Sequence, residues 1–296
     1  MENLKEKKLK ILISGSRGFV GKETCKLLEK EGHKIIHFDL IDGYDIRDYS
    51  ALELMIQRYY PDRILHLAAI ARFAEADEDP KLAFETNVLG TKNIAEIASR
   101  YKIPVVYSST GSTYMPITET PPITESFKTA GNSVYGCTKL MGEKYIESSQ
   151  GYWIILRYAH LYGKEKRYHG LIGGFLNRIQ RGLDPILYGG KQSNDFIYVK
   201  DVARANLLAL EAKPDSWRQH YNIGTGEELT AEEAGAMVII ANNKAKGYNK
   251  YTGTVERKEQ RTVDSERFVY DCSKAKNMLG FEAQYSFLEG LKDMFK

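Results

Sequence analysis

Five short apolar runs alternate with helical patterns in the first half of the chain, and no other feature constrains the fold as strongly. The runs lie at residues 9–14, 34–39, 63–68, 104–109 and 153–158. Helical patterns lie between them, notably at residues 18–31, 50–59, 80–100 and 133–149. Because the runs show little polar alternation, they are typical of parallel strands in a sheet that helices cover on both faces. The sequence therefore predicts an α/β fold of the Rossmann type, with a doubly wound parallel sheet.

A glycine-rich segment, SGSRGFVG, follows the first apolar run and opens the first helical pattern. It contains Gly15, Gly18 and Gly21 at the point where a strand is expected to turn into a helix. In this context the three glycines are typical of a dinucleotide-binding loop. Gly15 allows the tight turn, Gly18 the close approach of a pyrophosphate, and Gly21 close packing of helix on strand. The helix N-terminus then offers unpaired N–H groups to the phosphates.

Asp39 stands at the tip of the second apolar run, where it bears on the choice of cofactor. A carboxylate at this place accepts hydrogen bonds from the adenosine ribose hydroxyls and repels a 2′-phosphate. Arg17, in the glycine loop, argues the other way, because an arginine near this site can accommodate that phosphate. We give Asp39 the greater weight, and the sequence predicts NAD rather than NADP.

The pattern loosens after the fifth apolar run. Residues 164–192 and 226–270 mix glycine, charge and short helical patterns, whereas residues 193–225 read as a strand, a helix and a second strand. We therefore predict an NAD-binding Rossmann domain over residues 1–163, to which 193–225 return. A smaller α/β substrate-binding domain would consist of residues 164–192 and 226–296.

Composition narrows the class of protein. The chain has 296 residues, 43% of them hydrophobic, and a formal net charge of +3 at pH 7. This charge is too small to predict nucleic-acid binding, and we find no membrane-length apolar run and no secretory signal. The three cysteines, Cys25, Cys137 and Cys272, are far apart, and neither they nor the six histidines have a metal-binding spacing. We expect a reduced, cytoplasmic protein that binds no metal and no membrane.

A second group of residues carries chemistry. The fourth apolar run ends in three hydroxyls, Ser108, Ser109 and Thr110, while Tyr135 and Lys139 share one face of a helical pattern. Ligands bind outside the carboxyl ends of the strands in sheets of this kind, so the hydroxyls are expected to lie near the Tyr–Lys pair. A lysine ammonium favours the phenolate, which lets Tyr135 act as a base near neutral pH. Thr110 would orient the substrate alcohol and share its proton.

Many segments of the chain match the motifs of one protein family, in the order in which the family has them. They include "SGSRGFVG", "DIRD" (45–48), "HLAA" (66–69), "ETNVLGTKN" (85–93), "YSST" (107–110), "YGCTK" (135–139), "LRYAHLYG" (156–163), "NDFIYVKDVARANLLAL" (194–210), "YNIGTG" (221–226) and "SKAKNMLGF" (273–281). Over nearly its whole length the chain resembles the extended short-chain dehydrogenase/reductase family, in particular its nucleotide-sugar epimerase/dehydratase branch.

The resemblance implies a role for each matching residue. Catalysis would fall to Thr110, Tyr135 and Lys139, with Lys139 also holding the nicotinamide ribose. NAD would be bound by Gly15, Gly18, Phe19, Val20, Gly21, Asp39, Asp45, Ile46, Leu67, Ala68, Ala69, Asn87, Ser108, Tyr135, Lys139 and Ala159. Among these, Asp45 and Ile46 would flank the adenine, and Ala159 would lie near the nicotinamide. The substrate would meet Thr110, His160, Asn194 and Arg261.

The chain departs from the family pattern at several of these places. Gly111 and Ser112 stand where the dehydratases have an acidic pair, so 4,6-dehydration is not expected. His160 replaces an asparagine, and Asn194 an arginine, that the family uses for the nucleotide diphosphate. Arg261 matches the family's other phosphate arginine. The diphosphate-binding set is therefore weakened but not lost.

These observations lead to one prediction and two alternatives. We predict an NAD-dependent nucleotide-sugar epimerase that acts at the sugar C4 through a transient 4-keto sugar, with a UDP- or dTDP-linked substrate. A sugar or small hydroxy-compound dehydrogenase/reductase would use the same three residues and release its product, and Asn194 favours this alternative somewhat. A non-catalytic NAD-binding sensor or scaffold would not need a phenolate. By analogy with the family we expect a homodimer through the helices at 80–100 and 133–149.

Overall fold

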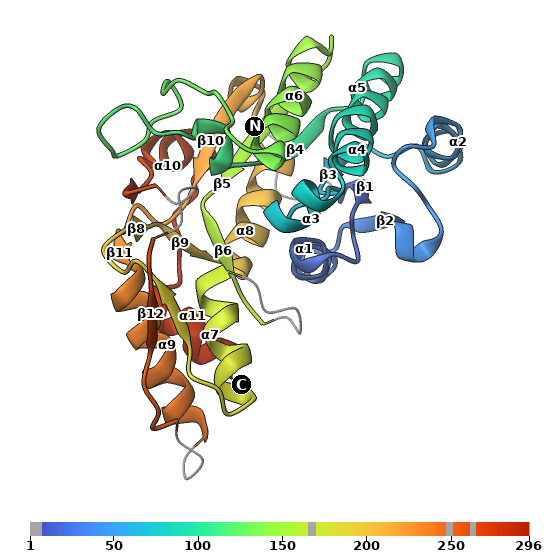
Figure 1. Ribbon diagram of the computed structural model, residues 1–296. Helices are drawn as coiled ribbons and strands as arrows, with labels where there is room; N and C mark the ends of the chain where they lie inside the picture. Colours follow the sequence, from blue (N-terminus) through green and yellow to red (C-terminus); the bar gives the residue numbers. More distant parts are fainter. Residues whose placement is uncertain (1–7, 165–169, 247–250, 261–264, 296) are drawn as a thin grey trace.

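A six-stranded parallel sheet forms the centre of the molecule (Figure 1). The computed structural model describes residues 8–164, 170–246, 251–260 and 265–295. The strand order is β10-β5-β4-β3-β1-β2, and every neighbouring pair is parallel. The strands are β1 (Lys10–Ser14), β2 (Lys34–Phe38), β3 (Arg63–His66), β4 (Val105–Thr110), β5 (Trp153–Tyr158) and β10 (Gln219–Ile223). The predicted fold class is confirmed, since helices cover both faces of this sheet.

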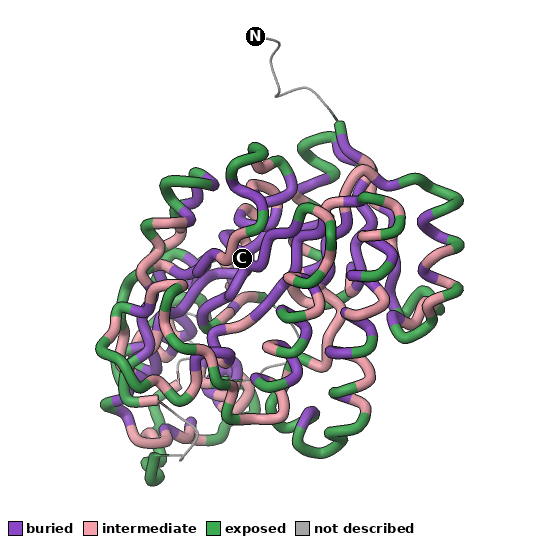
Figure 2. The backbone as a smooth tube through the Cα atoms, turned by 90° about the horizontal axis from the view of Figure 1, so that it is seen from above, coloured by how far each residue is buried: buried purple, intermediate pink, exposed green. Residues whose placement is uncertain are grey.

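Each face of the sheet has its own apolar core, because successive strand residues point to opposite sides. Ile11 and Ile13 of β1 pack in one core, whereas Leu12 between them packs in the other. The helices of the first face are α1 (Phe19–Lys30), α8 (Val199–Leu210) and α10 (Ser273–Leu279). Those of the second are α2 (Tyr49–Tyr59), α5 (Gly90–Tyr101) and α6 (Val134–Ser148). Figure 2 shows the strands as a buried layer between helices with exposed outer turns.

The region predicted as one helix over residues 80–100 is divided in the structure. It contains α4 (Pro80–Phe84), a π-helical turn (Glu85–Leu89) and then α5, and α3 (Phe73–Glu78) precedes it. A π turn widens the helix by one residue and is often found at functional sites. Here the turn contains Asn87, whose side chain is fully buried. The division therefore follows from a buried contact that helical periodicity does not reveal.

The C-terminal half is built from short strands that pair across long sequence distances. Its strands are β6 (His160–Tyr162), β7 (Ile186–Tyr188), β8 (Ser193–Asn194), β9 (Phe196–Tyr198), β11 (Leu229–Thr230), β12 (Glu256–Lys258) and β13 (Arg267–Phe268). β6 pairs with β9, β7 with β12, and β8 with both β11 and β13. Three further helices, α7 (Gly170–Gln180), α9 (Ala231–Lys246) and α11 (Phe287–Met294), pack around a third apolar core. The short 3-10 turns lie at Leu40–Asp42, Gly111–Tyr114 and Pro214–Ser216.

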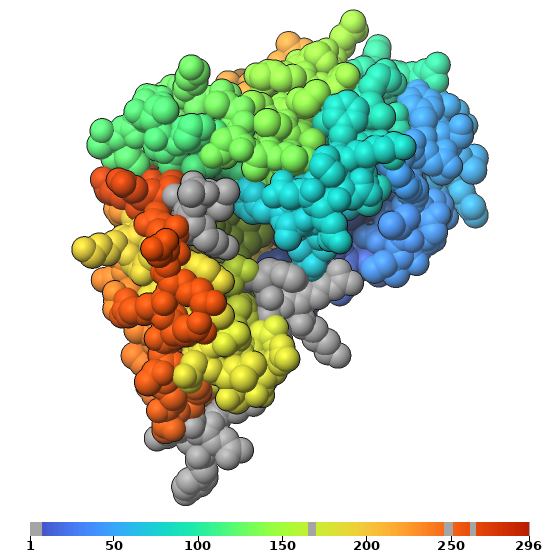
Figure 3. All heavy atoms as spheres, in the orientation of Figure 1, coloured from blue at the N-terminus to red at the C-terminus, as the bar shows by residue number. Residues whose placement is uncertain are grey.

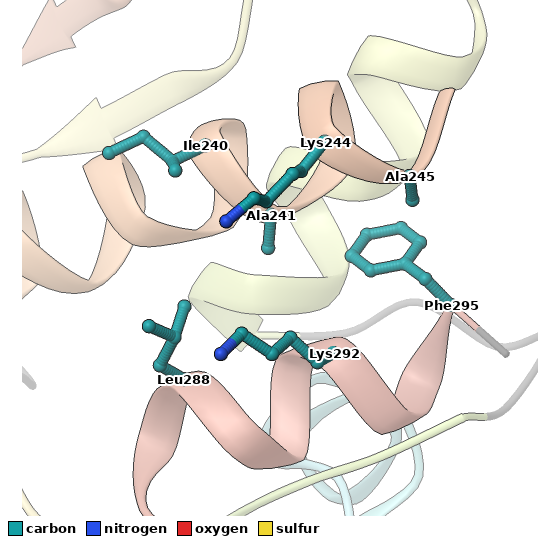
Figure 4. A pocket seen from close by; sticks show the side chains of 7 residues that line it. All are labelled: Ile240, Ala241, Lys244, Ala245, Leu288, Lys292 and Phe295. Atoms are coloured by element: carbon teal, nitrogen blue, oxygen red, sulfur yellow. The ribbon is translucent and has the colours of Figure 1, made fainter. Parts of the chain in front are cut away.

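The elements around the third core form a lobe of the surface, which we call the C-terminal lobe and which lies below most of the blue to green residues in Figure 3. At the outer end of the C-terminal lobe, α9 and α11 leave a groove of about 370 Å³ (Figure 4). Ile240, Leu288 and Phe295 line it with apolar surface, and Lys244 and Lys292 add charge. None of the helices in the described part of the chain has the length and apolar character needed to cross a membrane.

Candidate active site

The glycine loop packs so closely on the backbone around it that Gly15 and Gly21 have no room for a side chain. Gly15 follows β1 with φ of +73°, and a Cβ built on it would lie 2.7 Å from the backbone nitrogen of Ala68. A Cβ on Gly21 would lie 2.2 Å from the carbonyl oxygen of Gly15. Gly18 is the N-cap of α1 and has no side chain to cap it, so the first N–H groups of α1 are left for a ligand. The loop therefore fits a dinucleotide pyrophosphate.

Asp39 is buried beside this loop and held by two backbone donors. Its Oδ2 accepts from the Arg17 N–H at 2.8 Å, and its Oδ1 accepts from the Ile41 N–H at 3.0 Å. These bonds orient the carboxylate and leave further lone pairs for ribose hydroxyls. The Arg17 Nε donates instead to Asp42 Oδ2 at 2.9 Å. Because this carboxylate already pairs with the Arg17 guanidinium, the arginine is a weaker argument for NADP than its position in the sequence suggests.

Phe19 and Val20 open α1, and both are half-buried. Val20 packs against the first core and the C-terminal core, while Phe19 packs against the C-terminal core. A Cβ on Gly163 would lie 2.9 Å from the Phe19 ring, so the first turn of α1 lies against the chain that follows β6. This turn therefore connects the glycine loop with the C-terminal lobe.

Asp45 and Ile46 are committed to other partners in this structure. Asp45 Oδ2 accepts from Arg47 Nη2 at 2.6 Å, and this bond lowers the pKa of the Asp45 carboxyl. Ile46 is buried in the second core, where a Cβ on Gly90 would lie 2.7 Å from its Cγ2. Their predicted place beside an adenine stays a prediction.

Asn87 joins the loop after β3 to α6. Its Oδ1 accepts from the Ile70 N–H at 2.8 Å, and its Nδ2 donates to the Ile70 carbonyl and to Thr138 Oγ1, both at 3.0 Å. The loop also contains Leu67, Ala68 and Ala69, which are half-buried and lie next to Gly15. Asn87 thus holds the wall of the predicted cofactor path rather than forming an open part of it.

Thr110, Tyr135 and Lys139 come together at the carboxyl end of β4. Thr110 is the last residue of β4; its Oγ1 accepts from the Ser112 N–H at 3.2 Å, and its side chain is close enough to the Tyr135 phenol to lower the pKa of that group. Ser133 caps α6 by accepting from the Gly136 N–H at 3.0 Å, so that Tyr135 and Lys139 occupy its first two turns. The Phe73 ring of α3 meets the Tyr135 ring edge-on, with centroids 5.5 Å apart. The three predicted catalytic side chains are therefore neighbours.

Burial governs the ionisation of this group. It raises the pKa of the Tyr135 phenol to about 12, against the hydrogen bond with Thr110, and it lowers the pKa of the Lys139 ammonium to about 7. We expected the lysine charge to make the phenol more acidic, but burial dominates the pKa of Tyr135, and the group that opposes it is Thr110. Both shifts favour the uncharged side chains.

A buried ion pair lies one helical turn beyond Lys139. Arg157 of β5 donates through Nε to Glu143 Oε1 at 2.9 Å and through Nη2 to Oε2 at 2.6 Å, and both side chains are almost fully buried. Ser109 Oγ donates to the same carboxylate at 2.5 Å. Arg157 also donates to the Tyr114 hydroxyl at 2.7 Å. This network joins α6, β4 and β5 next to the predicted catalytic side chains.

The three hydroxyls at the end of β4 therefore have different partners. Ser108 Oγ donates to the His66 carbonyl at 3.0 Å and ties β4 to β3. Ser109 bonds Glu143, and Thr110 alone meets Tyr135. Sequence reasoning missed Glu143 and Arg157. The signal was the spacing, because Glu143 continues the helix face of Tyr135 and Lys139 by one more turn.

Two of the predicted substrate residues, His160 and Asn194, lie on the short strands β6 and β8. His160 is exposed, and its ring lies 5.1 Å from the Phe268 ring and 5.9 Å from the Phe196 ring. Asn194 of β8 is half-buried and pairs in register with Phe268 of β13. Ala159 is buried, and its N–H donates to the Ile223 carbonyl at 2.9 Å. Arg261, the predicted phosphate arginine, lies outside the described residues.

Gly111 has no room for a side chain. A Cβ on it would lie 2.3 Å from Cζ of Phe268 and 2.8 Å from the Tyr270 hydroxyl. An acid at this position would require both rings to move. The structure thus gives a steric reason for the glycine, and the exclusion of 4,6-dehydration stays a prediction.

Comparisons with known proteins point in one direction. The model of the NAD dependent epimerase/dehydratase family matches residues 11–224. A putative UDP-glucose 4-epimerase of Methanocaldococcus jannaschii is 32% identical over 312 residues, covering 95% of this chain and 96% of that protein. The UDP-glucose 4-epimerase of Rhizobium meliloti is 29% identical, with 93% of this chain and 92% of that protein covered.

Two solved structures are similar over almost the whole chain. The UDP-glucose 4-epimerase of Thermotoga maritima, determined with UDP-glucose, has a TM-score of 0.86 at 28% identity and covers 97% of both chains. The UDP-glucose 4-epimerase of Thermus thermophilus, in complex with NAD, has a TM-score of 0.82 at 29% identity. It covers 97% of this chain and 98% of that one.

Proposed function

The chain belongs to the NAD dependent epimerase/dehydratase family, and on that premise we propose that it is an NAD-dependent nucleotide-sugar epimerase acting at the sugar C4. Similar proteins are named UDP-glucose 4-epimerases, and one of the solved structures contains UDP-glucose. A UDP-linked sugar is therefore the substrate that we infer. The observation that carries this proposal is the meeting of Thr110, Tyr135 and Lys139 beside a loop shaped for a dinucleotide.

The residues of this chain divide the work of holding the cofactor. Gly15, Gly18 and the N-terminus of α1 would receive the pyrophosphate, Asp39 the adenosine ribose, and Lys139 the nicotinamide ribose. Bound NAD supplies reversible redox chemistry at C4, because its nicotinamide ring can accept a hydride and give it back. All other steps are proton transfers and positioning by the protein.

Tyr135 is the base in this mechanism. It takes the proton of the C4 hydroxyl, which Thr110 orients through its own hydroxyl, and it later returns a proton to the oxygen at C4. Lys139 contributes a positive charge that favours the phenolate, the form of Tyr135 that accepts the proton. Because Tyr135 ends each cycle as it began, the protein catalyses inversion at C4 without net oxidation.

The small positive charge around Asn194 is the reason for a second candidate function. Asn194 brings no charge to the diphosphate, and Arg267 on the adjacent strand is already paired with Glu228 at 2.6 Å. A cleft with less positive charge also suits a substrate without a diphosphate. A sugar or small hydroxy-compound dehydrogenase, which releases its keto product, is therefore the alternative.

We further propose a homodimer that works in the reduced cytoplasm. Phe84, Leu89 and Met141 are large apolar side chains that are exposed on α4, the π turn and α6. A second copy that covered these helices would remove their apolar surface from water. Cys25, Cys137 and Cys272 are all free thiols, as expected of a reducing compartment.

The test is to follow the sugar and the cofactor together. The purified protein is incubated with UDP-glucose, and separately with UDP-galactose, with NAD below the sugar concentration. NMR reports the sugar configuration and absorbance reports NADH. An epimerase interconverts the two sugars without accumulating NADH. Accumulation of NADH with an oxidised sugar would establish the dehydrogenase instead. The Tyr135→Phe variant serves as the inactive control in both assays.

A further inference from the structure

The Lys139 ammonium lies against the face of an aromatic ring. Its Nζ is 4.1 Å from the centroid of the Tyr107 ring, well within the range of about 6 Å in which a cation is attracted to such a face. Lys139 is 2% exposed and Tyr107 is fully buried. The contact is therefore shielded from water, which strengthens it.

This contact depends on how closely α6 approaches β4. Tyr107 points to the same side of β4 as Ser109, toward α6. A Cβ on Gly142 of α6 would lie 2.3 Å from the Tyr107 hydroxyl and 3.1 Å from its Cζ. The hydroxyl donates weakly to the Lys139 carbonyl at 3.4 Å. Gly142 thus lets the helix rest on the ring, with Lys139 one turn before it.

Other groups around Lys139 provide little net charge. From β3, His66 is fully buried and its pKa lies well below the ordinary value, because burial and the Lys139 charge both oppose protonation. From α6, Glu143 raises the pKa of Lys139, but its carboxylate is paired with Arg157 of β5. Tyr135 on the preceding turn adds no charge while its phenol is protonated. The ring of Tyr107 is the neighbour that favours the ammonium without a balancing cation.

The charge of Lys139 is finely balanced. Burial lowers the pKa of its ammonium to about 7, so modest interactions decide whether the side chain is charged at neutral pH. A neutral lysine would no longer stabilise the phenolate of Tyr135. Whatever holds the ammonium in its charged form therefore also sets the activity of the base.

We propose that Tyr107 is a positioning residue for the proton-transfer step, whose ring face keeps the Lys139 ammonium charged and aligned beside Tyr135. The proposal rests on the function proposed above, in which the Tyr135 phenolate is the base. The hydroxyl of Tyr107 bonds only weakly to the backbone carbonyl of Lys139. Tyr107 acts through Lys139, and the useful property is its aromatic face.

The geometry can be tested without any turnover. Protons on the Lys139 Cε lie above the ring and are expected to resonate upfield in protein with ¹³C-labelled lysine, through the ring current. Lys139→Met assigns the signal by removing it. Tyr107→Phe should keep the upfield shift, and Tyr107→Leu should abolish it. An unshifted Lys139 signal in the unsubstituted protein would refute the contact, whether or not the protein is an epimerase.

The functional consequence is tested by the pH profile of kcat/KM for sugar interconversion. In Tyr107→Leu the ascending limb should move about one unit to higher pH, equivalent to about 1.4 kcal/mol. The sign follows because a lysine that loses its charge more easily leaves the phenol harder to ionise. At pH 7 this corresponds to about a tenfold loss of kcat/KM. Tyr107→Phe should keep the original profile.

Two controls separate this role from packing. Tyr221→Leu removes another fully buried tyrosine of the same sheet, on β10, and should lower stability without moving the pH profile. Phenylalanines with increasing numbers of ring fluorines at position 107 keep the shape of the side chain but weaken the attraction of its ring face for a cation. This series also tests the proposal if Tyr107→Leu does not fold. A profile that moves stepwise with fluorination supports the proposal. A profile that stays fixed across the series overturns it.

Discussion

The two halves of the molecule are held together in different ways. In the cofactor half, residues of one parallel sheet bury an ion pair, Glu143–Arg157, in which the side chains are 0% and 4% exposed. In the C-terminal half, strands of two or three residues pair across long distances, and the ion pair Glu228–Arg267 is 30% and 50% exposed. The half that contains the predicted catalytic residues thus has its ion pair fixed by packing. The half that contains the predicted substrate residues His160 and Asn194 relies more on contacts at the surface, where substitutions cost less stability.

The largest expected difference is in turnover. Tyr135→Phe removes the base and should lower kcat by about a thousandfold for every sugar tested, while NAD affinity in a fluorescence titration stays nearly unchanged. His160→Ala, in the substrate half, should instead raise KM and alter the preference among sugars with kcat close to its original value. If Tyr135→Phe turned over normally, the proposed mechanism would be wrong.

The next comparison is in stability. Glu143→Gln leaves Arg157 buried with a neutral partner and should lower the free energy of unfolding by about 3 kcal/mol or more. Arg267→Gln breaks the exposed pair and should cost no more than about 1 kcal/mol. Urea unfolding followed by circular dichroism measures both. Equal losses from the two variants would contradict the contrast drawn between the halves.

At acid pH the free energy of unfolding of Glu143→Gln should approach that of the unsubstituted protein. Arg157 and Ser109 hold the pKa of the Glu143 carboxyl below its ordinary value. The folded state therefore gains stability from the ionised carboxylate above the ordinary glutamate pKa, and loses that gain as pH falls through the lowered value. Repeating the urea series from neutral pH into acid should show the two proteins converging.

A smaller effect is expected at the end of β4. Thr110→Ala removes the hydrogen bond to Tyr135 but keeps the base, so kcat should fall by about ten- to thirtyfold. Thr110→Ser keeps the hydroxyl and should retain most of the activity. Ser216→Ala, which loses a bond to the Met278 carbonyl outside the predicted site, is the matched control. Equal losses in Thr110→Ser and Thr110→Ala would show that the methyl group, not the hydroxyl, matters.

The smallest effect concerns cofactor choice. Asp39→Ser should weaken NAD binding by about tenfold, because it removes charge-assisted hydrogen bonds to the ribose. The affinity for NADP should rise most in the double variant Asp39→Ser, Asp42→Asn, because Arg17 is then no longer paired with a carboxylate. Calorimetric titration with both cofactors measures each step. Tighter binding of NADP than NAD by the unsubstituted protein would show that Arg17 was the better guide.

Local signals in the sequence were sufficient for the framework. The apolar runs lie over strands, of which β1, β4 and β5 are buried along nearly their whole length. The glycine triplet lies between β1 and α1. Both could be predicted because strand burial and a tight turn each depend on a few consecutive residues. Tyr135 and Lys139 were found by their helical spacing. Asp39 was found by its place after β2.

Only the tertiary structure decided which side chains face one another. Arg17 meets Asp42, Asn87 meets Ile70, and Phe268 lies against Gly111, although nothing in their sequence spacing indicates these contacts. The same holds for the ring of Tyr107 under Lys139, which depends on how closely α6 can approach β4 at Gly142. Periodicity specifies the face on which a residue lies, but the register between strands and the distance between helix and sheet specify its partner. Both come from the packing of the whole chain.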